Sequence, residues 1–250
     1  MNILDKFSLK GKKALIVCPE NTYGAQIAQA LEAAGAEIYL AGDVPTDIPA
    51  KKCFLYHHGQ LDSAIALAKE VSQQIGAPDI VVENGLCVDS TGWEQSYAQI
   101  NEQLKKTHLG LMLTVQHLGE LMAKKGSGSM ILVTDYGALV GYDVQNYVDC
   151  PELAEKDFSF VKGFVKGAAV NYARQASNYL AENGCRCNAL AFGPMAGQDP
   201  AFEEAFVRHS QVKRLATADD IAGAVVFFAS EASAFITGIT MPVDGGYTAK

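Results

Sequence analysis

The sequence predicts a single α/β domain with a doubly wound parallel sheet of about seven strands. Short apolar runs alternate with longer stretches of helical periodicity, and Gly or Asp stands at the junctions between them. The 250 residues, 49% of which are apolar, can bury one sizeable core. The chain contains no linker, repeat or low-complexity tract, so we expect this domain to span residues 1–250.

Seven apolar runs have the length of strands and are separated by helical stretches, which is the pattern of consecutive βαβ units. Parallel strands need crossover connections, so helices should cover both faces of the sheet. The expected strands are Ala14–Val17, Glu37–Ala41, Cys53–His57, Ile80–Val82, Met130–Thr134, Arg186–Ala191 and Thr240–Val243.

Two of the helical stretches are long. Leu109–Met122 is apolar around most of its circumference, so as a helix it needs cover on more than one side. Phe164–Glu182 is rich in alanine and places Val165, Ala169 and Ala176 on one broad face, together with two tyrosines. A helix of the first kind suits a subunit interface, and we expect an oligomer that forms through these two helices.

The charge balance is acidic. Asp and Glu number 28 against 20 Lys and Arg, which gives a net charge of −8 and a pI near 5.1. An acidic protein repels phosphate backbones and anionic lipid, so we expect neither nucleic acid nor a membrane as a partner. Residues 1–13 interleave charges with apolar positions and show neither a signal peptide nor a membrane span. We therefore expect the protein in the cytoplasm.

The six cysteines and five histidines do not form the pattern of a metal site. There is no C-x-x-C pair, and no histidine stands at a zinc-like spacing from the cysteines. Several cysteines lie inside apolar runs, where cysteine behaves as a small hydrophobic residue. We expect reduced, buried thiols and no bound metal.

Three segments carry a resemblance to a known family. They read LKGKKALIV near the beginning, KGAAVNYARQASNYLAENGCRCNALAFGP in the second half, and RLATADDIAGAVVFFASEASAFITGITMPVDGGY at the end. Together they resemble the short-chain dehydrogenase/reductase family over nearly the whole chain, and the ending is the most specific part. This resemblance implies a Rossmann-like fold and, for the family, NAD(P)-dependent oxidoreductase chemistry.

The family's nucleotide loop has three glycines between the first strand and the first helix. Here the loop reads VCPENTYGAQIA, so Cys18 and Thr22 stand in the first two places and Gly24 in the third. If either place needs a left-handed backbone, a non-glycine residue costs about 1 to 2 kcal/mol. A helix start capped by Asn21 or Thr22 could still hold an anion, but we favour a plain strand-to-helix connection.

Two further cofactor positions match the family only in part. Asp43 follows the second strand, where an acidic residue would pair with the adenosine ribose and select NAD. In the family's register, however, Gly42 takes that place, and Gly-Asp is also an ordinary turn. The family's N-N-A-G, which packs under the cofactor, reads ENGL here and retains Asn84. We expect no firmly bound cofactor, and NAD only as a weak or vestigial ligand.

The family's catalytic positions depart further. Its members use a tyrosine as acid and base, a lysine four residues later, an orienting serine and an asparagine in the preceding helix. No tyrosine in this chain is followed four residues later by a lysine. Lys166 fits the lysine, which puts Lys162 in the tyrosine place, Asp135 in the serine place and Thr107 in the asparagine place. An ammonium only donates hydrogen bonds, so Lys162 cannot pass a proton as a phenol does.

The substituted residues allow more than one interpretation. Two lysines four apart on one helical face, with Asp135 as counter-charge, are one known route to a nucleophilic lysine. We favour instead an Asp135–Lys162 ion pair that fills a disused pocket, or a Lys162 that points to water. Residues 141–159 are longer than the family's connection at this point and strongly acidic. They predict a flap, a solvated excursion or a partner contact.

Two hypotheses for function follow. The first is a non-catalytic subunit of a hetero-oligomeric NAD(P)-dependent oxidoreductase, paired with an active paralogue of the same family. The second is an active NAD(P)-dependent short-chain alcohol dehydrogenase or ketoreductase that draws its acid and base from Tyr136, Tyr142 or Tyr147. The sequence favours the first and names no substrate for the second.

Overall fold

The computed structural model describes residues 2–89 and 92–249. One parallel sheet lies at its centre, with the strand order β3-β2-β1-β4-β5-β6-β7. The strands are β1 Lys13–Val17, β2 Glu37–Gly42, β3 Lys52–Leu55, β4 Ile80–Glu83, β5 Gly128–Asp135, β6 Cys185–Phe192 and β7 Thr240–Val243. All seven expected strands are present, although the third ends two residues earlier than expected.

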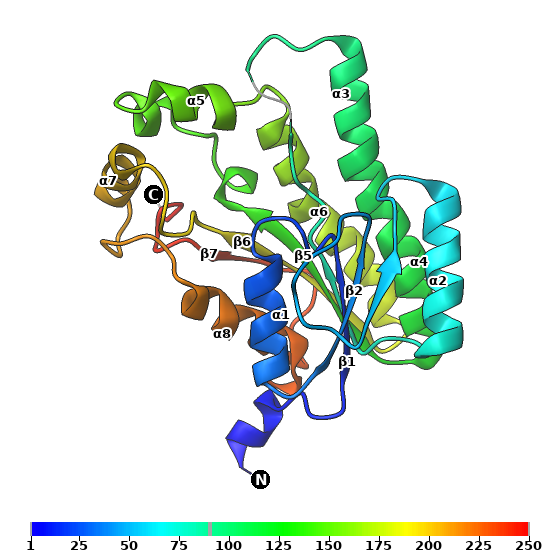
Figure 1. Cartoon of the computed structure of the whole chain (residues 1–250). Coiled ribbons are helices and arrows are strands. Elements are labelled where there is room, and N and C mark those ends of the chain that lie inside the picture. Colours follow the sequence, from blue (N-terminus) through cyan, green and yellow to red (C-terminus); the bar gives the residue numbers. More distant parts are fainter. Residues whose placement is uncertain (1, 90–91, 250) are drawn as a thin grey trace.

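Helices cover both faces of the sheet, as Figure 1 shows. The α-helices are α1 Gly24–Ala33, α2 Leu61–Gln74, α3 Tyr97–Leu104, α4 Gly110–Lys125, α5 Pro151–Asp157, α6 Lys162–Ala181, α7 Pro200–His209 and α8 Ala218–Ala229. Short 3-10 helices lie at Ile3–Phe7, Tyr136–Ala138, Val144–Tyr147 and Glu231–Ser233, and a π-helical turn at Lys105–Leu109 joins α3 to α4. The expected doubly wound α/β domain is confirmed.

Two apolar cores hold these layers together. Along β1, Leu15 and Val17 point to the core shared with α2, α4 and α6, whereas Ala14 and Ile16 point to the core shared with α1 and α8. All four side chains are fully buried. This alternation with a period of two follows from the pleat of a strand, and burial on both faces explains why the run is continuously apolar.

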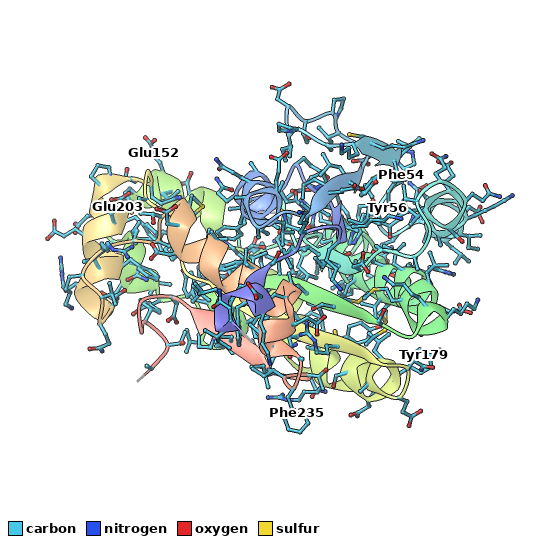
Figure 2. All side chains as sticks on the ribbon, turned by 90° about the horizontal axis from the view of Figure 1, so that it is seen from below. Phe54, Tyr56, Glu152, Tyr179, Glu203 and Phe235 are labelled. Carbon is cyan, nitrogen blue, oxygen red and sulfur yellow. The ribbon has the colours of Figure 1, made fainter. Side chains whose placement is uncertain are left out.

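The long helix α6 buries only part of the face that the sequence predicts. Val165, Ala169 and Ala176 are buried, but Tyr179 is 59% exposed and lies on the outer side of the helix in Figure 2. None of the described helices is both long enough and apolar enough to cross a membrane.

The long insertion at residues 141–159 is anchored rather than solvated. Its buried Tyr147 packs on Phe202 of α7 with ring centroids 5.1 Å apart. The Asn146 amide donates to the Tyr247 hydroxyl at 2.9 Å, and Figure 1 shows α5 and α7 at the same end of the molecule. The exposed carboxylate of Glu152 points outward there. The expectation of a solvated excursion is therefore wrong for the inner side of this segment.

All six cysteines are free thiols, and they differ sharply in exposure. Cys53 is exposed and Cys87 half-buried, while burial raises the pKa of Cys87. Burial also raises the pKa of Cys187 to about 12. The remaining buried thiols are Cys18, Cys150 and Cys185. Burial is thus confirmed for four cysteines and wrong for Cys53.

This difference predicts how the thiols react. In the native protein we expect one fast-reacting thiol, Cys53, because the thiolate is the reactive form and needs access to the reagent. Titration with a chromogenic disulfide reagent before and after unfolding measures this count. Cys53→Ser should remove the fast phase and leave the slow phases unchanged. A fast phase that persists in this variant would contradict the assignment.

Candidate active site

The candidate site lies at the carboxyl ends of the strands, where the strand order reverses between β1 and β4. Ligands of open α/β sheets bind in the crevice at such a switch point. A cavity of about 220 Å³ opens here, and the residues that line it come from the nucleotide loop, the end of β5, helix α6 and the segment after β6. Asp135, Lys162 and Lys166 are among them.

The nucleotide loop adopts strained backbone at two residues that are not glycine. Cys18 has a φ of 52° and Tyr23 a φ of 77°, in the left-handed region where a side chain costs about 1 to 2 kcal/mol. Cys18, in the first glycine place, therefore has the left-handed backbone that is costly for a residue other than glycine. At the second place the left-handed residue is Tyr23, the neighbour of Thr22, and not Thr22 itself.

The third glycine of the loop is required by packing. A Cβ atom at Gly24 would overlap the carbonyl oxygen of Pro19 and lie 2.7 Å from its carbonyl carbon. Because both are backbone atoms, no rotamer change can relieve the overlap. Gly24 thus lets α1 start directly against the loop.

Asn84 fastens this loop to the sheet. Its side-chain amide donates to the backbone carbonyls of Cys18 and Thr22, both at 3.2 Å, and the Asn21 amide donates back to the Asn84 carbonyl at 2.9 Å. Helix α1 has Tyr23 as its N-cap, without a side-chain hydrogen bond. The expected cap by Asn21 or Thr22 is therefore wrong, because Asn21 is engaged with Asn84.

Tyr23 crosses the crevice. Its hydroxyl donates to the backbone carbonyl of Gly193 at 3.1 Å, and its ring packs on Phe192 with centroids 4.9 Å apart. This links the loop after β1 to the end of β6. The second cavity beside it, which Asn84 also lines, measures only about 30 Å³, roughly the share of one water molecule in the liquid.

One acidic residue belongs to the loop and a second stands beside it. Asp43 follows β2 and pairs with His57, with Oδ2 and Nδ1 3.3 Å apart. The Glu20 carboxylate lies against Gly42, 2.7 Å from the place of a Cβ atom there, and its Oε2 is buried without a hydrogen-bond partner in the part of the chain that the structure describes. Burial raises the pKa of Glu20, and the charge of Asp43 raises it further. Negative charge therefore gathers at the end of β2.

These residues do not fit a dinucleotide in the arrangement seen here. The family's diphosphate lies over the loop at the start of the first helix. Here the Tyr23 ring spans the crevice. Burial raises the pKa of the Cys18 thiol well above its ordinary value, and the nearby charges of Glu83, Glu20 and Asp43 raise it further.

The catalytic positions form a closed polar network. Lys166 Nζ lies 3.1 Å from Asp135 Oδ2, and these side chains are 14% and 13% exposed. The other carboxylate oxygen accepts from the Tyr142 hydroxyl at 2.6 Å and from the Gly137 amide at 2.9 Å. Asp135 thus pairs with Lys166, and the expected pair with Lys162 is wrong.

Lys162 lies over an aromatic ring instead. Its Nζ is 4.6 Å from the centroid of the Tyr142 ring, a cation–π geometry. The expectation that Lys162 simply points to water is also wrong. The Tyr142 ring covers Gly137, where a Cβ atom would overlap it. Burial raises the pKa of the Tyr142 phenol, and the charge of Asp135 raises it further.

The remaining candidate catalytic residues are poorly placed to exchange a proton with a substrate. Thr107 is fully buried in the π-helical turn, and its hydroxyl donates to the Gln103 carbonyl at 2.6 Å. Tyr136 lines the cavity, but burial raises the pKa of its phenol. Tyr147 packs on Phe202 and is not among the lining residues. Of the three phenols considered, Tyr142 makes the closest contacts with the substituted positions.

Sequence reasoning missed Tyr23 and Glu20. The glycine places are the recognisable positions of this loop, whereas the side chain that crosses the crevice belongs to the residue between two of them. The available signal was a large aromatic side chain at residue 23, directly before Gly24. Among the described residues, no group of three or more His, Cys, Asp or Glu side chains is arranged to hold a metal ion.

Comparison with known proteins places the chain in a family. The sequence model of a family described as enoyl-(acyl carrier protein) reductase matches residues 19–248. The chain belongs to the short-chain dehydrogenase/reductase family. A sorbose reductase of Candida albicans is 26% identical to it, over 99% of this chain and 90% of that protein. A 7alpha-hydroxysteroid dehydrogenase of Clostridium sardiniense is 24% identical, over 96% of this chain and 94% of that protein.

Solved structures show the same fold. A gluconate 5-dehydrogenase from Burkholderia cenocepacia, in complex with NADP and tartrate, superposes with a TM-score of 0.84 at 22% identity and 99% coverage of both chains. A short-chain dehydrogenase from Leptospira borgpetersenii with bound NAD+ gives 0.84 at 19% identity, over 99% of this chain and 96% of that one. The Rossmann-like fold of this short-chain dehydrogenase/reductase is thereby confirmed.

Proposed function

We propose that this chain is a non-catalytic member of the short-chain dehydrogenase/reductase family and serves as a subunit of a hetero-oligomeric NAD(P)-dependent oxidoreductase. The observation that carries the proposal is the closed network at the catalytic positions. Asp135 accepts hydrogen bonds from Tyr142 and Gly137 and pairs with Lys166, while Lys162 stands where the family has its tyrosine.

The chemistry of this network supports the loss of activity. Reduction of a carbonyl needs a group that gives up a proton, and a positioned acid or base contributes about 10² to 10⁴ in rate. The phenol of Tyr142 is hydrogen-bonded to a carboxylate, which raises its pKa and so opposes proton release. In the family a lysine lowers the pKa of the catalytic tyrosine. The two arrangements have opposite effects on the phenol.

Apolar side chains on the two long helices support a role in assembly. Met112 on α4 is 45% exposed, and Leu109, the residue directly before this helix, is 38% exposed. Phe164 on α6 is 66% exposed. Family members commonly assemble through these two helices, so an inactive copy can pair with an active paralogue. Assembly and catalysis use different faces of the fold, which allows one to persist without the other.

The cofactor test is a titration with NADH and NADPH that follows nicotinamide fluorescence. We expect no saturable binding below millimolar cofactor, because Tyr23 spans the crevice. Tyr23→Gly removes the ring that spans the crevice, so it should tighten binding by about tenfold or more, which corresponds to about 1.4 kcal/mol. Tyr179→Ala, an exposed tyrosine on α6, is the matched control. Saturable micromolar binding to the unaltered protein would contradict the proposal.

The assembly test is native mass spectrometry of the protein purified from its own source. We expect a complex that contains a second, different chain of the same family. Retained nucleotide would appear in the same spectrum and would report on the partner's site. A stable homotetramer from expression of this chain alone would count against the hetero-oligomer.

A second candidate function is an active NAD(P)-dependent alcohol dehydrogenase or ketoreductase that uses Tyr142. The lining of the cavity by this phenol, beside both lysines, favours it, and the curated relatives reported above are named as a reductase and a dehydrogenase. Turnover of any aldehyde or ketone that is lost in Tyr142→Phe, with NADPH or NADH present, would support this candidate. Absence of cofactor binding in the titration above would eliminate it.

A further inference from the structure

A buried pair of opposite charges lies beneath the nucleotide loop, at the end of β4. His58 Nε2 is 3.0 Å from Glu83 Oε1, and the two side chains are 6% and 0% exposed. The same carboxylate oxygen accepts from the Gly85 amide at 2.8 Å. The other oxygen, Oε2, has no hydrogen-bond partner among the described residues. Glu83 therefore depends on His58 for most of the interaction that offsets the cost of burying its negative charge.

The second ring nitrogen of His58 also meets an acceptor. Nδ1 lies 2.5 Å from the backbone carbonyl of Lys106, which belongs to the π-helical turn Lys105–Leu109. A carbonyl oxygen only accepts hydrogen bonds, and so does an ionised carboxylate. Nδ1 therefore donates to this carbonyl. Nε2 makes no hydrogen bond among the described residues, so its contact with Glu83 is an ion pair that forms when His58 is an imidazolium and Glu83 is ionised.

The fold makes room for this ring at two glycines. A Cβ atom at Gly85, after β4, would overlap the His58 ring. A Cβ atom at Gly110, the first residue of α4, would lie 2.7 Å from the ring's Cγ. These glycines come from separate elements and neither has a positive φ. Glycine is required at both positions because the His58 ring leaves no space for a side chain.

The groups around the ring favour its charged form. Tyr56 packs edge-on at 5.6 Å between centroids, and Glu20 acts on the ring from the nucleotide loop. Burial lowers the pKa of His58, but the charge of Glu83, the Lys106 carbonyl and the charge of Glu20 all raise it, and the net pKa is raised. The ammonium of Lys106 is held by an acidic side chain elsewhere.

We propose that His58 and Glu83 form a proton-dependent latch that ties the end of β4 to the π-helical turn. Asn84, the residue after Glu83, holds the nucleotide loop through the carbonyls of Cys18 and Thr22. The latch therefore also sets the position of that loop. When His58 loses its proton, the ion pair is lost and the buried carboxylate loses its counter-charge. This inference does not depend on whether a dinucleotide binds.

The sign of the pH effect follows from the raised pKa of His58. In the unfolded chain the imidazole has its ordinary pKa of about 6.5. The stabilisation from the latch is fully present below that pH and is lost as pH rises through the higher pKa of the folded state. We expect the melting temperature to fall across this window. In Glu83→Gln, which lacks the charge, the fall should be at least halved.

The direct test is a nitrogen-detected NMR titration of the histidine side chains in the unaltered protein. We expect both nitrogens of His58 to be protonated at pH 7, with a titration midpoint above the ordinary value of about 6.5. His57 is the matched control, because it also pairs with a carboxylate but its side chain is 43% exposed. A neutral His58 with one protonated nitrogen at pH 7 would overturn the proposal.

Hydrogen exchange tests the mechanical part of the latch. After correction for the intrinsic pH dependence of exchange, residues 83–85 and 105–110 should lose protection by about tenfold or more between pH 6 and pH 9. Segments on the far face, such as α8, should keep theirs. Equal loss in all segments, or none in residues 83–85, would show that His58 does not act as a latch. His57→Gln should behave as the unaltered protein.

Discussion

Replacement of Asp135 by alanine is expected to lower the free energy of unfolding by about 3 to 5 kcal/mol, the usual cost of removing one partner of a buried ion pair. Lys166, only 14% exposed, would lose its counter-charge. The Tyr142 hydroxyl and the Gly137 amide would lose their common acceptor. Urea denaturation followed by circular dichroism measures the change.

Two further variants make this prediction specific. Asp135→Asn keeps an acceptor for Tyr142 and Gly137 but not the charge, so it should recover part of the loss. Glu204→Gln breaks an exposed pair with Arg208 and should leave the denaturation curve unchanged, because exposed pairs contribute little. If Asp135→Ala were as stable as Glu204→Gln, the network would not be the tightly held unit described above.

Gly24→Ala is the second change with a large expected effect. The added methyl group would overlap the carbonyl oxygen of Pro19, so either the loop or the start of α1 must move. Overpacking of this kind lowers the free energy of unfolding by about 1 to 3 kcal/mol and occasionally more. We expect a loss of about 3 kcal/mol here, because the overlap is with rigid backbone. The same urea denaturation gives the value.

Gly223→Ala is the matched control for this change. Gly223 lies inside α8, and a Cβ atom there would meet nothing within 4 Å. Alanine is favoured over glycine inside a helix by up to about 1 kcal/mol, so this variant should be more stable than the unaltered protein. Opposite signs for the two variants are the expected result, and a neutral Gly24→Ala would contradict the packing described for the loop.

Much of the fold could be predicted because its signals are local. Apolar runs such as Ile80–Val82 have strand length, and helical periodicity separates them, so the βαβ order follows from the sequence alone. The sequence predicts the third strand at Cys53–His57, but this strand ends at Leu55. Beyond it the chain turns to bring His58 under β4, a contact that no local pattern reveals.

The candidate site was harder because its contacts depend on orientation. Lys162 and Lys166 are one helical turn apart, and the sequence does not show which of them faces Asp135. In the structure it is Lys166. The role of Thr107 depends on a π-helical turn, for which residues 105–109 carry no distinct signal. Tyr23 was missed because its left-handed backbone is a property of the folded loop.

The insertion at residues 141–159 shows a third limit of prediction from sequence. Its acidic residues predicted exposure, which fits Glu152 at the surface. Its aromatic and amide residues, by contrast, join a cluster with distant partners. Asn146 reaches Tyr247, 101 positions later in the chain. Composition describes the outer side of such a segment well, but the inner side depends on tertiary contacts.

The amide of Asn84 and the hydroxyl of Tyr23 give the crevice its own internal fastening. Proteins that rely on a bound coenzyme to order this region gain rigidity only when that coenzyme is abundant. A chain that orders the region by itself keeps one shape whether pyridine nucleotides are plentiful or depleted.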